Sequence, residues 1–185
     1  MKRITLILTI LLIGICSMPA AAQFEIGASY ELRDENPENG FGIRIQKGLF
    51  ESLPVVNLGV RLHASYFSDE NNLSRNGVSY SQDLTNYDVG IAAYGGVGLG
   101  LLEPYAGVGL GTENFESVID NYSGSEELTG EESGLYWNTF VGAKVTIIPM
   151  LKPFVEYRYS DKELSSPKLQ DAQSGRIAFG ILISF

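Results

Sequence analysis

Charged side chains of both signs recur at alternate positions along several otherwise apolar stretches of the sequence. In β-strands, alternation with a period of two places the charges on one face and the apolar residues on the other. Such charges can pair in an enclosed interior or line a path for protons or ions. We expect ion pairs, because an unpaired buried charge is strongly destabilising. The predicted interior network comprises Glu25, Arg44, Arg61, His63, Asp88, Lys144, Glu156 and Arg158, with Glu31, Arg33 and Arg176 on the same face.

A second group of titratable residues is an acidic run between residues 112 and 133, which contains no Lys or Arg. We expect solvated charge on a loop that can be shortened without loss of folding, since long surface loops add little closure entropy. Bridging of lipopolysaccharide phosphates by divalent cations is the alternative. No calcium-loop spacing occurs here, and one His and one Cys exclude a zinc cluster, so no metal or cofactor is expected. The acids are Glu113, Glu116, Asp120, Glu126, Glu127, Glu131 and Glu132.

The β-strands that must position these charged groups are predicted most clearly at the C-terminal end of the chain. Residues 175–185 alternate between a wholly apolar face and a mostly small or polar one, as a lipid-facing barrel strand does. The stretch resembles the closing strand of bacterial outer-membrane barrels, whose assembly signal matches Gly180, Ile183 and Phe185, although Ala178 replaces a usually polar residue. The resemblance implies recognition by the barrel assembly machinery. We expect deletion of Phe185 to lower the folded fraction sharply and Leu182→Ala to be mild.

The first 22 residues are predicted to be a cleaved secretory signal peptide. Lys2 and Arg3 precede the apolar stretch 4–15, and Ala20 and Ala22 fit a small-residue cleavage site. The apolar stretch is too short for a spanning helix. Cleavage would leave residues 23–185 as one domain with no cysteine, 11 basic and 22 acidic residues, and a formal net charge of −11. Such a charge makes nucleic acid an unlikely partner.

The mature chain is predicted to be all-β, with eight strands of alternating polarity. Polar loops are expected at 34–40, 68–84, 112–133 and 160–174, and short turns at 51–54, 97–103 and 149–152. The glycine-rich stretch 89–102 is read as strand, turn and strand, because glycine disfavours a helix. The expected strands are 24–33, 41–49, 56–66, 85–95, 104–111, 135–147, 154–159 and 175–185.

An even number of antiparallel strands joined by alternating short turns and long loops is typical of an outer-membrane barrel. With the motifs 104–111 and 154–159 and the Phe185 ending, the chain resembles the small outer-membrane β-barrel domain family, similar to OmpA and OmpX. The resemblance implies an eight-stranded antiparallel up-and-down transmembrane β-barrel in the bacterial outer membrane. Its long loops would face outwards and bind or adhere at the surface, with an unknown ligand. Outer-membrane lipids and lipopolysaccharide would surround it.

Two other functions remain open. His63 and Ser65 lie two residues apart, a spacing that resembles the His-x-Ser of outer-membrane lipid A deacylases, in which serine attacks an ester and histidine takes its proton. Tyr66 stands where that family has asparagine. A soluble lipocalin-like carrier is the other alternative, and it would hide its apolar face inside the barrel. We expect a non-enzymatic barrel whose narrow interior is filled by side chains.

Overall fold

The computed structural model describes residues 24–49, 56–75, 78–120, 128–148, 150–163 and 173–185. The predicted signal peptide, residues 1–22, lies outside them, as do Glu126 and Glu127 of the acidic run. No helix long and apolar enough to cross a membrane occurs in the described part of the chain.

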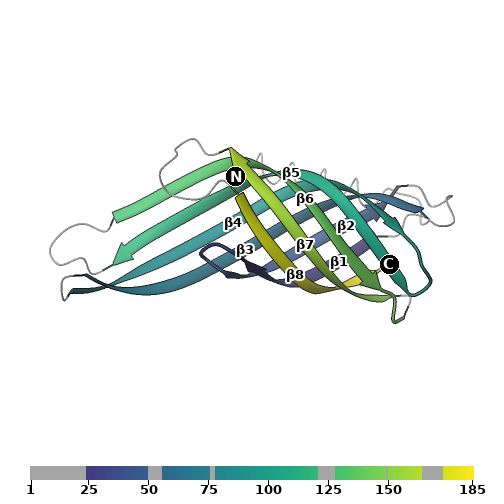
Figure 1. Ribbon diagram of the computed structural model, residues 1–185, viewed down its shortest axis with the longest axis horizontal. Helices are drawn as coiled ribbons and strands as arrows, with labels where there is room; N and C mark the ends of the chain where they lie inside the picture. Colours follow the sequence, from purple (N-terminus) through teal and green to yellow (C-terminus); the bar gives the residue numbers. More distant parts are fainter. Residues whose placement is uncertain (1–23, 50–55, 76–77, 121–127, 149, 164–172) are drawn as a thin grey trace, which may run out of the picture.

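Eight antiparallel strands form a closed barrel, in which each strand pairs with its neighbours in sequence and β1 closes against β8 (Figure 1). This confirms the predicted fold class. The strands are β1 (Phe24–Arg33), β2 (Asn39–Gly48), β3 (Val56–Arg75), β4 (Val78–Val97), β5 (Leu102–Asp120), β6 (Leu128–Val145), β7 (Leu151–Glu163) and β8 (Gln173–Ser184).

The prediction of loops at 68–84 and 112–133 is wrong, because most of the residues in these two segments belong to strands. The hairpin of β3 and β4 pairs continuously to Arg75↔Val78, through the segment 68–84. The strands β5 and β6 likewise pair out to Ile119↔Leu128, within the segment 112–133. These segments are mostly polar, so they lack the regular alternation that marked the other strands. Pairing across the hairpins decides their conformation instead.

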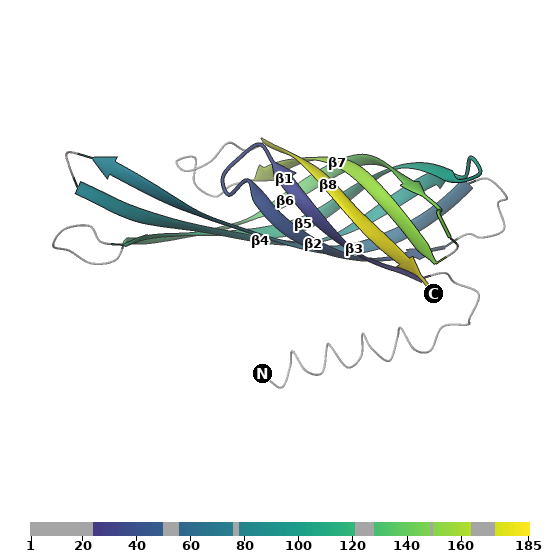
Figure 2. The same ribbon diagram turned by 90° about the horizontal axis from the view of Figure 1, so that it is seen from below.

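The four strands β3–β6 therefore extend beyond the rest of the barrel as a projecting sheet, made of residues 68–75, 78–85, 116–120 and 128–134 (Figure 2). The opposite end of the barrel carries the tight connection from Val97 to Leu102. The C-terminus lies at this end as well, where the Phe185 N–H donates a hydrogen bond to the Phe24 carbonyl. We call the two ends the hairpin end and the turn end.

The two faces of the strands differ as predicted. Outward residues are apolar and exposed, such as Ile43 at 63%, whereas its neighbour Arg44 points inward and is 2% exposed. Exposed aromatic rings include Tyr30, Phe41, Tyr66, Tyr87 and Trp137 near the hairpin end. The arrangement is the reverse of a soluble barrel, with apolar residues outside and charges inside.

Glycines on the inner face make room for the aromatic rings of the interior. A Cβ atom on Gly107 would lie 2.3 Å from the Phe140 ring, and one on Gly180 would lie 2.5 Å from Phe154. The expected mild effect of Leu182→Ala is at odds with this packing. Leu182 is 1% exposed and forms an apolar cluster with Phe154 and Ala178, so its removal would leave a cavity.

Candidate functional site

The barrel interior is occupied by charged side chains from all eight strands, and it is the candidate site. All eight residues of the predicted network are buried there, none more than 5% exposed. Ion pairs divide the interior into a turn-end cluster, a mid-barrel cluster and a hairpin-end cluster along the barrel.

The turn-end cluster joins two lysines and two glutamates. Lys144 Nζ lies 3.1 Å from Glu25 and 3.0 Å from Glu103, and Lys152 also pairs with Glu25. Gln46 donates a further hydrogen bond to Glu25. Sequence reasoning missed Glu103 and Lys152, because it assigned both to turns. The structure places Glu103 as the second residue of β5 and Lys152 as the second of β7, facing inward.

The mid-barrel cluster is centred on Glu156 of β7. Its carboxylate contacts the guanidiniums of Arg44 at 2.9 Å, Arg61 at 2.6 Å and Arg158 at 3.1 Å. Tyr105 donates a hydrogen bond to the same carboxylate. Aromatic faces cover two of the cations: Arg61 lies 4.4 Å from the Phe140 ring centre and Arg44 lies 4.0 Å from that of Phe154. Such contacts further stabilise buried cations.

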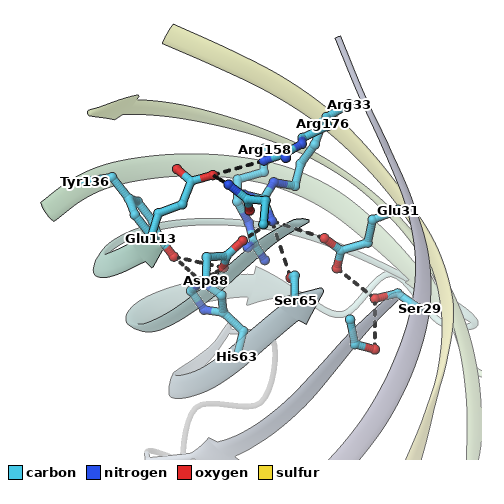
Figure 3. A network of polar contacts seen from close by, with 12 residues as sticks. Ser29, Glu31, Arg33, His63, Ser65, Asp88, Glu113, Tyr136, Arg158 and Arg176 are labelled. Atoms are coloured by element: carbon cyan, nitrogen blue, oxygen red, sulfur yellow. Dashed lines mark hydrogen bonds and ion pairs between the residues drawn. The ribbon is translucent and has the colours of Figure 1, made fainter. Parts of the chain in front are cut away.

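The mid-barrel cluster continues through Arg176, which lies opposite Arg158 in the register of β7 and β8. One nitrogen of Arg176 is 2.7 Å from Asp88 and 3.2 Å from Glu31 (Figure 3). We define the mid-barrel cluster as Arg44, Arg61, Arg158, Arg176, Glu31, Asp88 and Glu156.

The hairpin-end cluster joins Arg33 and Lys162 to Glu35 and Glu113. Glu113 accepts from Arg33 at 3.0 Å and pairs with Lys162 at 2.9 Å, and Lys162 also reaches Glu35 at 2.6 Å. Sequence reasoning placed Glu35, Glu113 and Lys162 in loops. For Glu113 this is a correction of the acidic-run prediction, since it is 6% exposed inside the barrel.

The other described residues of the acidic run, Glu116, Asp120, Glu131 and Glu132, lie on the projecting sheet. Glu116 and Glu131 are directly opposite each other on β5 and β6, as Glu70 and Asp83 are on β3 and β4. The side chain of Asp120 lies outside the described residues. Within the described ranges no group of three or more His, Cys, Asp or Glu side chains is arranged to hold a metal ion.

His63 and Ser65 do not form a nucleophile and base pair. Nε2 of His63 contacts the Tyr136 hydroxyl at 2.9 Å, and this hydroxyl donates to Asp88 at 3.2 Å. The Ser65 hydroxyl instead accepts a hydrogen bond from Arg176 at 3.3 Å. Both residues point into the interior and are 4% exposed (Figure 3), so neither lies on the outer face of the barrel.

Among the described residues, the projecting sheet has an unpaired edge on each side. The last pair between β2 and β3 is Gly40↔Phe67, and the last pair between β6 and β7 is Leu135↔Glu163. Beyond these pairs, the described partners of residues 68–75 of β3 all belong to β4, and those of residues 128–134 of β6 all belong to β5. Unpaired strand edges present rows of free backbone donors and acceptors.

The chain matches the family model described as "Outer membrane protein beta-barrel domain" over residues 8–180. No curated protein sequence shows significant similarity to it.

Several solved structures resemble the chain at 15–16% identity, a level that indicates the fold alone. A major outer membrane protein from Thermus thermophilus has a TM-score of 0.65 at 16% identity, covering 89% of this chain and 100% of that one. Neisserial surface protein A has 0.59 at 16%, covering 89% and 97%. The attachment invasion locus protein Ail of Yersinia pestis, solved with the heparin analogue sucrose octasulfate, has 0.55 at 15%, covering 89% and 97%.

Proposed function

The chain belongs to the outer membrane protein beta-barrel domain family, and from this premise we propose that it is a non-enzymatic, plugged barrel that anchors a binding sheet on the cell surface. The observation that carries the proposal is the projecting sheet with its two unpaired edges. Outer-membrane barrels place their short turns in the periplasm and their long connections outside. The projecting sheet would then stand above the outer leaflet, where partners can reach it.

The binding mode that fits an open edge is addition of an extended segment of the partner as a further strand. Main-chain hydrogen bonds supply affinity in this mode, and alternate side chains supply specificity. The charges on the sheet indicate the partner. Asp69 and Glu70 lie on the β3 edge and Glu131 and Glu132 on the β6 edge, so a segment rich in Lys or Arg fits. A polysulfated ligand such as the one crystallised with Ail would be repelled.

The interior supports the same proposal. Eight strands enclose a bore just wide enough for side chains, and here buried guanidiniums, carboxylates and aromatic rings point into it. A soluble carrier would need an apolar interior for its cargo, and catalysis by Ser65 would need the base that His63 does not provide. We therefore propose a mechanical role for the interior, which is to stabilise the anchor and close it to solutes.

The binding test uses two peptides of opposite charge. A fluorescent peptide of alternating Lys and Val and its Glu and Val counterpart would be titrated with the refolded protein in detergent, with anisotropy as the readout. We expect the lysine peptide alone to bind, and its affinity to fall with salt because the attraction is electrostatic.

Two variants locate this binding on the projecting sheet. In the first, residues 70–83 and 118–129 are each replaced by Asn-Gly, which favours a two-residue hairpin turn. In the second, Glu70→Lys and Glu131→Lys reverse one charge at each edge. Both new lysines would oppose a carboxylate, Asp83 or Glu116, so the sheet itself should gain stability. Loss of peptide binding in both variants is expected, whereas unchanged binding to either would refute the assignment.

Assembly is proposed to depend on the end of β8. The barrel assembly machinery would read Gly180, Ile183 and Phe185, and outer-membrane lipids and lipopolysaccharide would then surround the apolar outer face. Phe185 is 71% exposed, so its deletion removes little packing. We expect the deletion to lower the membrane-inserted fraction in cells at least several-fold, measured by the heat shift of boiled and unboiled samples on gels. In vitro refolding should change little, and equal insertion of both chains in cells would contradict the proposal.

A further inference from the structure

The buried charges of the barrel balance in two clusters and not in the third. The turn-end cluster holds two lysines and two glutamates, and the hairpin-end cluster holds one arginine, one lysine and two glutamates. In the mid-barrel cluster four guanidiniums face three carboxylates. Counting these guanidiniums and carboxylates alone, this region carries one excess positive charge, where both neighbouring clusters carry none.

The excess charge coincides with hydrogen-bond donors that have no partner among the described residues. Four buried guanidinium nitrogens have no partner among the described residues. Three of them belong to the mid-barrel cluster, namely Nη2 of Arg44 and the Nε and Nη1 atoms of Arg158. Each of these two residues is 2% exposed. Each of them donates to Glu156 through another guanidinium nitrogen, so the two guanidiniums that carry the unpartnered nitrogens contact the same carboxylate.

Further polar groups without a described partner lie on the inner face of the barrel, next to Arg158. Asn138, Ser160 and Ser174 lie opposite one another across β6, β7 and β8, one row nearer the hairpin end than Arg158. Both amide atoms of Asn138 and both serine hydroxyls are buried and have no partner in the described part of the chain. A native interior satisfies nearly all such groups with protein, water or ions.

We propose that the mid-barrel cluster binds one monovalent inorganic anion of the halide class on the free nitrogens of Arg44 and Arg158. A single negative charge restores neutrality to the cluster and accepts charge-assisted hydrogen bonds, which are stronger than neutral ones. Water alone would satisfy the donors and leave the charge unbalanced. The rings of Phe140 and Phe154 already pack on Arg61 and Arg44, which favours a small ion over a bulky one.

The direct test is crystallography of the full barrel refolded in sodium bromide, since an ion in a plugged interior would enter during folding. We expect a bromide anomalous peak within hydrogen-bonding distance of Arg44 and Arg158. The absence of a peak there, including the case of surface peaks from an adventitious ion only, would overturn the proposal.

A solution test uses thermal unfolding at constant ionic strength, with bromide replacing the bulky anion methanesulfonate. A bound ion stabilises the folded state in proportion to its occupancy, so the midpoint should rise with bromide and saturate. Arg158→Met removes the excess charge and should abolish the rise. Lys152→Met removes a cation from a balanced cluster and should retain it. If Arg158→Met does not fold, Arg44→Met replaces it, and a rise that persists in the arginine variant refutes the site.

Discussion

Replacing Glu156 with glutamine is expected to destabilise the barrel by about 3–5 kcal/mol, the usual effect of breaking a buried ion pair. The substitution keeps the shape of the side chain and removes its charge. Arg44, Arg61 and Arg158 would then share no carboxylate, although all three remain buried. Urea unfolding in lipid vesicles measures the loss, with fluorescence of Trp137, the single tryptophan of the chain, as the probe.

Glu131→Gln is the matched control for this substitution. Glu131 lies on the projecting sheet directly opposite Glu116, so neutralising it relieves repulsion and should change stability by less than about 0.5 kcal/mol. Equal effects of the two substitutions would mean that the interior ion pairs do not hold the barrel together.

Leu182→Ala is expected to cost about 2–5 kcal/mol, the range for leucine truncated in a packed core. Leu182 fills the space beside Gly27, where a Cβ atom would lie 2.7 Å from the leucine side chain, and it packs with Phe154. The cavity would form inside the barrel, where lipid cannot enter. The same urea titration measures the effect.

Ile181→Ala on the same strand tests the reason for this cost. Ile181 faces outward and is 48% exposed, so lipid tails can fill the space that the truncation leaves. We expect a markedly smaller loss of stability for Ile181→Ala. A loss as large as that of Leu182→Ala would show that lipid does not compensate for missing side-chain volume.

The inward or outward direction of side chains was predictable wherever a strand separates two different environments. Strand 24–33 was placed with its observed bounds, and all eight residues of the predicted network do point inward. Alternation disappears where both faces meet water, so the outer parts of β3 to β6 were mistaken for loops. Glu113 was misplaced although it faces the interior, because its neighbours Thr112 and Asn114 are polar and the apolar alternation therefore ends before it.

The pairing of the charges could not be predicted, because it depends on strand register and on closure of the barrel. Glu156 meets Arg44 and Arg61 across 112 and 95 residues of sequence. A shift of one strand by two residues would keep every side chain on its face and change these partners. The sequence also contains no signal that separates three clusters or leaves one of them with excess charge.

The most direct test of the plugged anchor is planar-bilayer recording of the refolded full-length barrel. The proposal predicts no steady single-channel current, because paired charges and packed rings fill a bore of eight strands. The trimmed variant lacking residues 70–83 and 118–129 should be equally silent, since the proposed plug consists of residues within the barrel and not of the projecting sheet. Steady, reproducible currents from the intact protein would contradict the proposal and identify Glu156, Arg158 and their neighbours as pore-lining residues.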